Sequence, residues 1–196
     1  MRLILASRSA ARSAVLAGAG VAFETAAAPV DEAFEKVRLL AEGKGPREVA
    51  EALAVLKAQA VDAPAGSLVI GADQTLDLDG QLFDKAESLP EARTRLQQLR
   101  GREHRLHAAV VVVKDREPIW RETATATLTM RDFSDAFLDA YLAADAEQLL
   151  GSVGCYRLEG PGAQLFSAIE GDYFAILGLP LLGLLDLLRR EGELVA

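Results

Sequence analysis

The sequence predicts a mixed α/β or α+β fold around one mixed, twisted β-sheet with flanking helices. Three short runs of apolar and β-branched residues have the length of buried strands, namely Leu3–Ala6, Leu68–Ile70 and Ala108–Val113. Segments with helical spacing separate these runs, so strands and helices intermix along the whole chain. The 196 residues are enough to bury a core as a single domain over residues 1–196, with room for two lobes.

The first half of the chain begins with the strand Leu3–Ala6, which runs into a helix over Ala10–Ala17. Gly18 or Gly20 ends this helix, because glycine favours the backbone conformation found just after a helix. Phe23–Ala28 has an extended pattern. Pro46 suits the first turn of the next helix, whose apolar residues share one face: Val49, Leu53, Leu56 and Ala60.

The second half continues the alternation of strands and helices. Ser88-Leu89-Pro90-Glu91 resembles a capping box and opens a helix to about Arg100. Ala108–Val113 suits a central strand that is buried on both faces. The elements expected after it are a strand over Ile119–Met130, a helix over Ser134–Ala144, a glycine-rich loop over Gly151–Gly162, a strand over Gln164–Ile169 and a helix over Pro180–Arg190.

The segment Ile70–Lys85 has the pattern most suggestive of chemistry. The short strand is expected to break at Gly71 and to present Asp73 at its end, before the acidic turn Asp77–Gly80 and the lysine Lys85. A carboxylate beside a buried strand, with an ammonium group twelve residues on, suits metal-assisted chemistry on an anionic substrate. A hairpin with a surface Asp-Gly turn explains the same residues. This segment alone leaves both interpretations open.

Composition excludes several classes of function. The net charge of −8 repels nucleic acid and anionic lipid, so neither is an expected partner. A phosphate substrate would need a local basic cluster and a divalent cation. The single Cys155 excludes a disulfide framework and a cysteine-based zinc site, and His104 and His107 are too few for a histidine-rich metal centre.

Neither end of the chain has the pattern of a membrane segment. The apolar run Leu3–Ala6 is far too short for the core of a signal peptide. Phe174–Leu185 is apolar, but it is interrupted by Pro180 and is too short to span a bilayer. We therefore expect a cytoplasmic protein with no membrane partner.

A candidate phosphate site lies in the turn Ala6–Arg12, between the first strand and the first helix. Its amides and hydroxyls, including that of Ser7, can bind an anion at the helix N-terminus, and Arg12 can clamp an oxyanion. A capped helix with solvated arginines is the simpler interpretation. The motifs of P-loop enzymes, of dinucleotide-binding folds and of the Gly-x-Ser-x-Gly elbow are absent from the sequence.

Taken together, the motifs resemble the Maf family of house-cleaning nucleotide pyrophosphatases. In order, they are LILASRSAAR, VDE, LKAQAV, IGADQ, FDK, EGDYF and LGLPLLGLL, from Leu3 to about Arg190. The resemblance implies a two-lobed α/β fold with a cleft between the lobes, and commonly a homodimer. It also implies hydrolysis of a nucleoside triphosphate substrate to monophosphate and pyrophosphate, assisted by Mg²⁺ or Mn²⁺.

The family's functional residues match six positions of this chain. The resemblance implies that Asp73 and Glu32 hold the divalent cation, and that Asp73 orients or deprotonates the attacking water. The groups that would neutralise the triphosphate are Ser7, Arg12, Lys57 and Lys85. Each residue has a simpler explanation: Glu32 as a helix cap, Lys57 as a solvated helix residue, and Lys85 as a surface partner of Asp84 or Glu87.

Two further positions bear on the choice of base. Gln74 and Glu159 resemble the 7-methyl-GTP branch of the family, whereas the thymidine/uridine branch typically has Thr and Gln there. A carboxylate can accept two hydrogen bonds from the N1–H and exocyclic amine of guanine, and N7-methylation makes that base cationic. A thymine or uracil edge offers one donor only, so carboxylate oxygens opposite it would stay unpaired.

The chain departs from the family pattern in the first turn and after Lys85. Ala10 replaces the usual proline, Ser13 replaces an arginine, and Ala11 replaces an aromatic residue that the 7-methyl-GTP branch often has. Ala86 replaces a proline, and Asp172-Tyr173-Phe174 is closer to the thymidine/uridine pattern. Three alternatives therefore stay open: a dTTP/UTP pyrophosphatase, a preference for cytidine or another modified nucleotide, and a non-catalytic nucleotide-sensing regulator linked to cell division.

Overall fold

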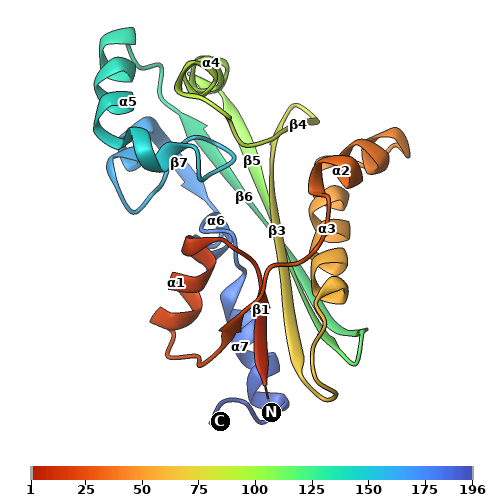
Figure 1. Cartoon of the computed structure of the whole chain (residues 1–196). Helices are drawn as coiled ribbons and strands as arrows, with labels where there is room; N and C mark the ends of the chain where they lie inside the picture. Colours follow the sequence, from red (N-terminus) through yellow and green to blue (C-terminus); the bar gives the residue numbers. More distant parts are fainter. Residues whose placement is uncertain (1, 196) are drawn as a thin grey trace.

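The computed structural model describes residues 2–195, which form a seven-stranded mixed sheet with helices on both faces (Figure 1). The sheet order is β2-β1-β3-β5-β6-β7, and β4 pairs with β3 off this path. The strands are β1 (Leu3–Ala6), β2 (Glu24–Thr25), β3 (Leu68–Leu78), β4 (Gln81–Phe83), β5 (Glu103–Lys114), β6 (Glu117–Met130) and β7 (Phe166–Glu170). The helices are α1 (Ala10–Gly18), α2 (Glu32–Ala41), α3 (Pro46–Ala60), α4 (Leu89–Leu99), α5 (Asp135–Leu149), α6 (Tyr173–Ile176) and α7 (Leu181–Arg190). The predicted fold class is confirmed.

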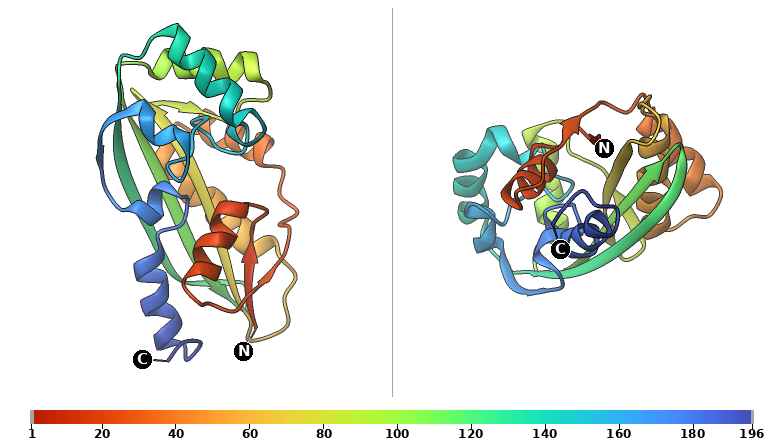
Figure 2. Two further views of the ribbon diagram at one scale, coloured as in Figure 1. Left: turned by 90° about the vertical axis from the view of Figure 1, so that its left-hand side faces the viewer. Right: turned by 90° about the horizontal axis from the view of Figure 1, so that it is seen from below.

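The two largest hydrophobic clusters of the described residues lie at opposite ends of the long strands. One core joins α4 and α5 to the second half of β3, beginning at Leu76. The other joins β1, α1 and α7 to the first half of β3, up to Ala72. In Figure 1 and the left view of Figure 2, α4 and α5 lie at one end, whereas α7 and the two termini lie at the other. The boundary between the cores therefore falls at Asp73 and Gln74.

One edge of β3 is interrupted at the same place. β1 pairs with β3 in parallel and ends at the pair Ala6–Gly71. β4 pairs with β3 antiparallel and reaches only as far as Leu76. Along residues 72–75 no strand of the described chain pairs with this edge, whereas β5 pairs with the opposite edge throughout. Backbone groups and side chains at this interruption are thus available to other partners.

Helix α3 packs against β3 at Gly71. A Cβ atom at this position would lie 2.1 Å from the carbonyl oxygen of Ala54 and 2.8 Å from Cβ of Ala58. Only glycine permits such an approach, and small alanines on the buried face of α3 let the two elements meet. This contact fixes the last turn of α3 over the strand, next to Asp73.

The expected break at Gly71 is wrong, because β3 continues to Leu78 and Asp73 lies inside the strand. Gly71 marks a close contact with a helix, which local sequence does not reveal. The hairpin interpretation is confirmed: Asp79 and Gly80 have φ values of 54° and 84° and join β3 to β4. This hairpin begins beyond Asp73, so it does not exclude chemistry at that carboxylate.

Other boundaries also differ from expectation. The extended segment Phe23–Ala28 contains only the two-residue strand β2. The expected strand Gln164–Ile169 begins later, because Pro161–Leu165 forms a 3₁₀ helix before β7. The short helix α6 was not expected. No helix among residues 2–195 has the length and apolarity needed to cross a membrane.

The contact at Gly71 predicts a large effect for a small substitution. We expect Gly71→Ala to lower the free energy of unfolding by about 1–3 kcal/mol, because the added methyl group forces α3 away from β3. Urea unfolding measures this loss. Gly18→Ala is the matched control, since a Cβ there meets nothing within 4 Å, and it should leave stability unchanged or slightly raised. Equal stability of both variants would contradict the close packing of α3.

Candidate active site

The centre of the site is an ion cluster between α3 and β3. Lys57, in the last turn of α3, and Asp73, in β3, are 6% and 5% exposed. The Nζ atom of Lys57 lies 2.7 Å from Oδ1 of Asp73 and 2.8 Å from Oε2 of Glu32 at the start of α2. Lys57 therefore bridges two carboxylates that are far apart in sequence. The alternative of a solvated Lys57 is wrong, and Asp31 rather than Glu32 caps α2.

The second carboxylate oxygen of Asp73 has no protein partner. Its Oδ2 atom is buried and accepts no hydrogen bond from the described residues. A buried oxygen of this kind is costly unless water, a proton or a cation meets it. Asp73 thus has one oxygen held by Lys57 and one oxygen free for chemistry.

The donor set fits a magnesium-like ion that shares its coordination with substrate. Such ions favour oxygen ligands and commonly use one or two carboxylates together with water and phosphate oxygens. Glu32 and Asp73 supply two carboxylates, and no group of three or more acidic, His or Cys side chains within residues 2–195 could hold a metal ion. Glu32 and Asp73 are therefore the two carboxylates of this cluster that could contribute to holding such an ion.

Arg12 lies at the interrupted edge of β3. Its Nη1 donates to the carbonyl oxygen of Ala72 at 3.0 Å and to Oγ of Ser7 at 3.2 Å, and its Nε donates to the carbonyl of Gly178 at 2.8 Å. Burial lowers the pKa of Arg12 from its ordinary value, although Asp73 and Glu32 oppose the change. These contacts fix the guanidinium beside the site, so the alternative of a solvated Arg12 is wrong.

Lys85, a solvent-exposed residue, adds a third positive charge near the cluster. Partial burial is the largest influence on the pKa of Lys85 and lowers it, and the charges of Arg12 and Lys57 lower it further. The charges of Glu32 and Asp73 raise it. The same five charged groups therefore influence one another across the interruption in the sheet. Asp84, one of the two surface partners expected for Lys85, pairs with Lys36 of α2 at 2.6 Å.

The side chain of Gln74 lies on the face of β3 opposite to that of Asp73, because successive side chains of a strand alternate between its two faces. Its Nε2 donates to the carbonyl oxygens of Ala175 and Ile176 at 2.9 and 3.0 Å, which ties β3 to α6. Glu159 lines an open groove of about 360 Å³ whose other lining residues are Ala11, Ala14, Val15, Gly18, Ala19, Phe174, Leu177 and Leu181. The two base-specificity candidates thus lie on the α1 and α6 side of the sheet.

Comparison with known proteins places this site in a family. The family model described as Maf-like protein matches residues 2–191. The chain belongs to the Maf-like protein family. A Caulobacter vibrioides relative called nucleoside triphosphate pyrophosphatase is 59% identical over 190 residues, covering 97% of this chain and 96% of the relative. A Rhizobium meliloti relative called 7-methyl-GTP pyrophosphatase is 48% identical, with coverage of 99% and 98%. A Brucella abortus relative with the same name is 45% identical, with coverage of 97% and 96%.

In this Maf-like chain, six of the eight predicted site residues meet at one place. Ser7, Arg12, Glu32, Lys57, Asp73 and Lys85 gather at the interruption in the sheet. Sequence reasoning missed Gly178, whose carbonyl holds Arg12. The sequence signal for a turn there was the glycine itself, two residues before Pro180, and the structure gives it a φ of 92°.

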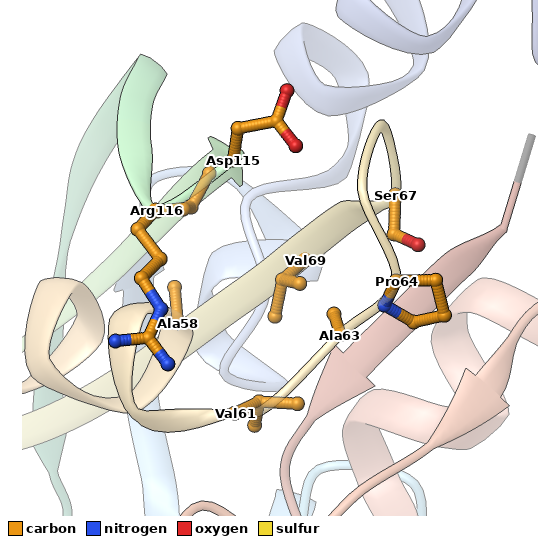
Figure 3. Close-up of a pocket in the computed structure, with 9 residues that line it drawn as sticks. Ala58, Val61, Ala63, Pro64, Ser67, Val69, Asp115 and Arg116 are labelled. Carbon is orange, nitrogen blue, oxygen red and sulfur yellow. The ribbon is translucent and has the colours of Figure 1, made fainter.

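Figure 3 shows a second cavity of the Maf-like chain. It has a volume of about 30 Å³ and lies beyond the end of α3, between Ala58, Val69 and Arg116. That volume suits one or two water molecules and excludes a nucleotide. None of the predicted site residues lines it.

Proposed function

We infer that the chain hydrolyses nucleoside triphosphates to nucleoside monophosphate and pyrophosphate. The observation that carries this conclusion is a buried carboxylate with one unpartnered oxygen, Oδ2 of Asp73, among three cationic side chains. The names of the Caulobacter, Rhizobium and Brucella relatives support the same reaction. Relatives at 45–59% identity over nearly the whole chain make this activity the best supported one.

Each group has a role that its surroundings favour. A water oxygen forms a bond to the α-phosphorus, and the bond from that phosphorus to the bridging oxygen of pyrophosphate breaks. The free oxygen of Asp73 orients this water and accepts its proton. Arg12, Lys57 and Lys85 bind the triphosphate and stabilise the charge that moves onto pyrophosphate. Ser7, hydrogen-bonded to Arg12, adds a hydroxyl for a phosphate oxygen.

We also propose that the activity depends on Mg²⁺ or Mn²⁺. Glu32 and Asp73 would hold the cation, and phosphate oxygens and water would complete its coordination. The cation would supply positive charge that polarises the phosphoryl group. Support comes from the two carboxylates, which lie close enough to share the ammonium of Lys57.

Replacement of Asp73 tests the reaction. We expect Asp73→Asn to lower pyrophosphate release by about 100-fold or more, because the amide cannot accept the proton from water. Calorimetry should show that the variant still binds nucleotide. Asp79→Asn is the matched control, since this aspartate lies in the exposed hairpin turn and should keep full activity. Turnover close to the unaltered rate in Asp73→Asn would contradict the assignment.

We propose 7-methyl-GTP as the preferred substrate class. Glu159 is the one charged side chain among the described residues that line the 360 Å³ groove, where Phe174 adds an aromatic ring. A carboxylate and a ring together favour a cationic purine that donates two hydrogen bonds from its edge. Ala11 leaves the groove open where the branch often has an aromatic residue. The relatives from Rhizobium meliloti and Brucella abortus have this substrate in their names.

A change at Glu159 tests the base preference. We expect Glu159→Gln to lower the ratio of kcat/KM for 7-methyl-GTP to that for dTTP by about tenfold or more, because the amide presents one acceptor in place of two. A nucleotide panel with Mg²⁺ or Mn²⁺ measures the ratio, and the exposed Glu117→Gln provides the control. An unchanged ratio, or fast release from dTTP or UTP by the unaltered protein, would overturn the base assignment. No pyrophosphate release from any nucleotide of the panel would favour the alternative of a non-catalytic nucleotide-sensing regulator.

We further propose a cytoplasmic homodimer of single domains spanning residues 1–196, with neither nucleic acid nor membrane as a partner. The family resemblance supports the dimer, and the net charge of −8 supports the absence of anionic partners. Light scattering of the purified chain should give twice the mass of 20.9 kDa. A mass of 20.9 kDa at micromolar concentration would contradict the dimer.

A further inference from the structure

Lys57 occupies the position that a cation would take between Glu32 and Asp73. Its ammonium lies 2.8 and 2.7 Å from the nearest oxygens of these two carboxylates. They are the same two acids that would hold a divalent cation. The carboxylate pair is therefore already neutralised in part by a charge that belongs to the chain.

The charges of the cluster disfavour the binding of a divalent cation while the Lys57 ammonium lies between the two carboxylates. Three cationic side chains, those of Arg12, Lys57 and Lys85, share the cluster with the two carboxylates. Lys57 and Asp73 are almost fully buried, so water screens their attraction poorly. A divalent cation that enters without phosphate would meet a site whose net charge is already positive.

A triphosphate reverses this balance. Its oxygens add several negative charges at the interruption in β3. They can accept hydrogen bonds from the ammonium of Lys57, which can move to them because its stem of four methylene groups is flexible. If the Lys57 ammonium moved away from Glu32 and Asp73 without finding a new partner, a buried charge would be left unpaired. Glu32 and Asp73 therefore lose their ion pairs with Lys57 only when the phosphate groups of the triphosphate bind.

We propose that Lys57 is an internal counter-ion that keeps a divalent cation out of the nucleotide-free protein. The cation binds well only together with the triphosphate, when phosphate oxygens take over the ammonium. This inference rests on the proposed function, because it takes a triphosphate as the displacing ligand. It assigns to Lys57 a positioning role toward Glu32 and Asp73, in addition to phosphate binding.

Titration with Mn²⁺ in the absence of nucleotide tests the proposal, with free Mn²⁺ followed by electron paramagnetic resonance. Lys57→Met removes the charge and should bind Mn²⁺ tighter than the unaltered protein by about tenfold or more. Lys57→Arg keeps the charge and should bind as weakly as the unaltered protein. Lys44→Met removes an exposed lysine just before α3 and should change nothing. Equal Mn²⁺ affinity in Lys57→Met and the unaltered protein would overturn the proposal.

A second measurement needs no charge-removing variant, in case Lys57→Met does not fold. The chain has five lysines, so ¹⁵N-labelled lysine gives a simple spectrum of side-chain ammonium groups. Mg²⁺ alone should leave the Lys57 signal in place, and Mg²⁺ with the α,β-methylene analogue of GTP should shift it. The signal is assigned by its loss in Lys57→Arg. A shift with submillimolar Mg²⁺ alone would overturn the proposal.

These outcomes are separable from failure of the proposed function. Pyrophosphate release by the unaltered protein, with no gain of Mn²⁺ affinity in Lys57→Met, would leave the hydrolase intact and reject the counter-ion role. A gain of Mn²⁺ affinity without release from any nucleotide would support the counter-ion role and reject the hydrolase.

Discussion

The site depends on the close packing of α3 against β3. Because Gly71 has no side chain, the backbone of α3 at Ala54 can approach the strand, and Lys57 then comes within hydrogen-bonding distance of Asp73. Burial of this pair strengthens its attraction and raises the cost of leaving either partner alone. One contact between a helix and a strand thus determines where the carboxylate and its cation lie.

The interruption at the edge of β3 gives this buried pair access to a ligand. A continuous sheet would cover residues 72–75 on both edges, whereas here β1 stops at Ala6 and β4 starts beyond the gap. Arg12 binds the carbonyl of Ala72 at the gap, and Gln74 ties the other face of the strand to α6. The strand is therefore held firmly on both sides of an opening, which suits a site that must keep its geometry while it binds nucleotide.

Local pattern predicted the sheet class and most of the helices, since these depend on the spacing of apolar residues. Predictions from local pattern were wrong where a contact between residues far apart in sequence determines the structure. Gly71 has the local signature of a strand end, but its neighbour in space is α3. Lys57 has the signature of a solvated residue, but Glu32 and Asp73 bury its charge. The joint prediction of the site came from the order of motifs, and the carbonyl of Gly178 that holds Arg12 depends on a contact between the two ends of the chain.

We infer that the triphosphate binds in the gap of β3, with Asp73 at its middle. A crystal structure with Mg²⁺ and a non-hydrolysable α,β-methylene analogue of 7-methyl-GTP would show whether it does. We expect phosphate oxygens against Arg12, Lys57 and Lys85, the α-phosphate beside Oδ2 of Asp73, and the base in the groove of Glu159. A triphosphate bound elsewhere on the chain, with the Lys57 ammonium still between Glu32 and Asp73, would rule out this binding site.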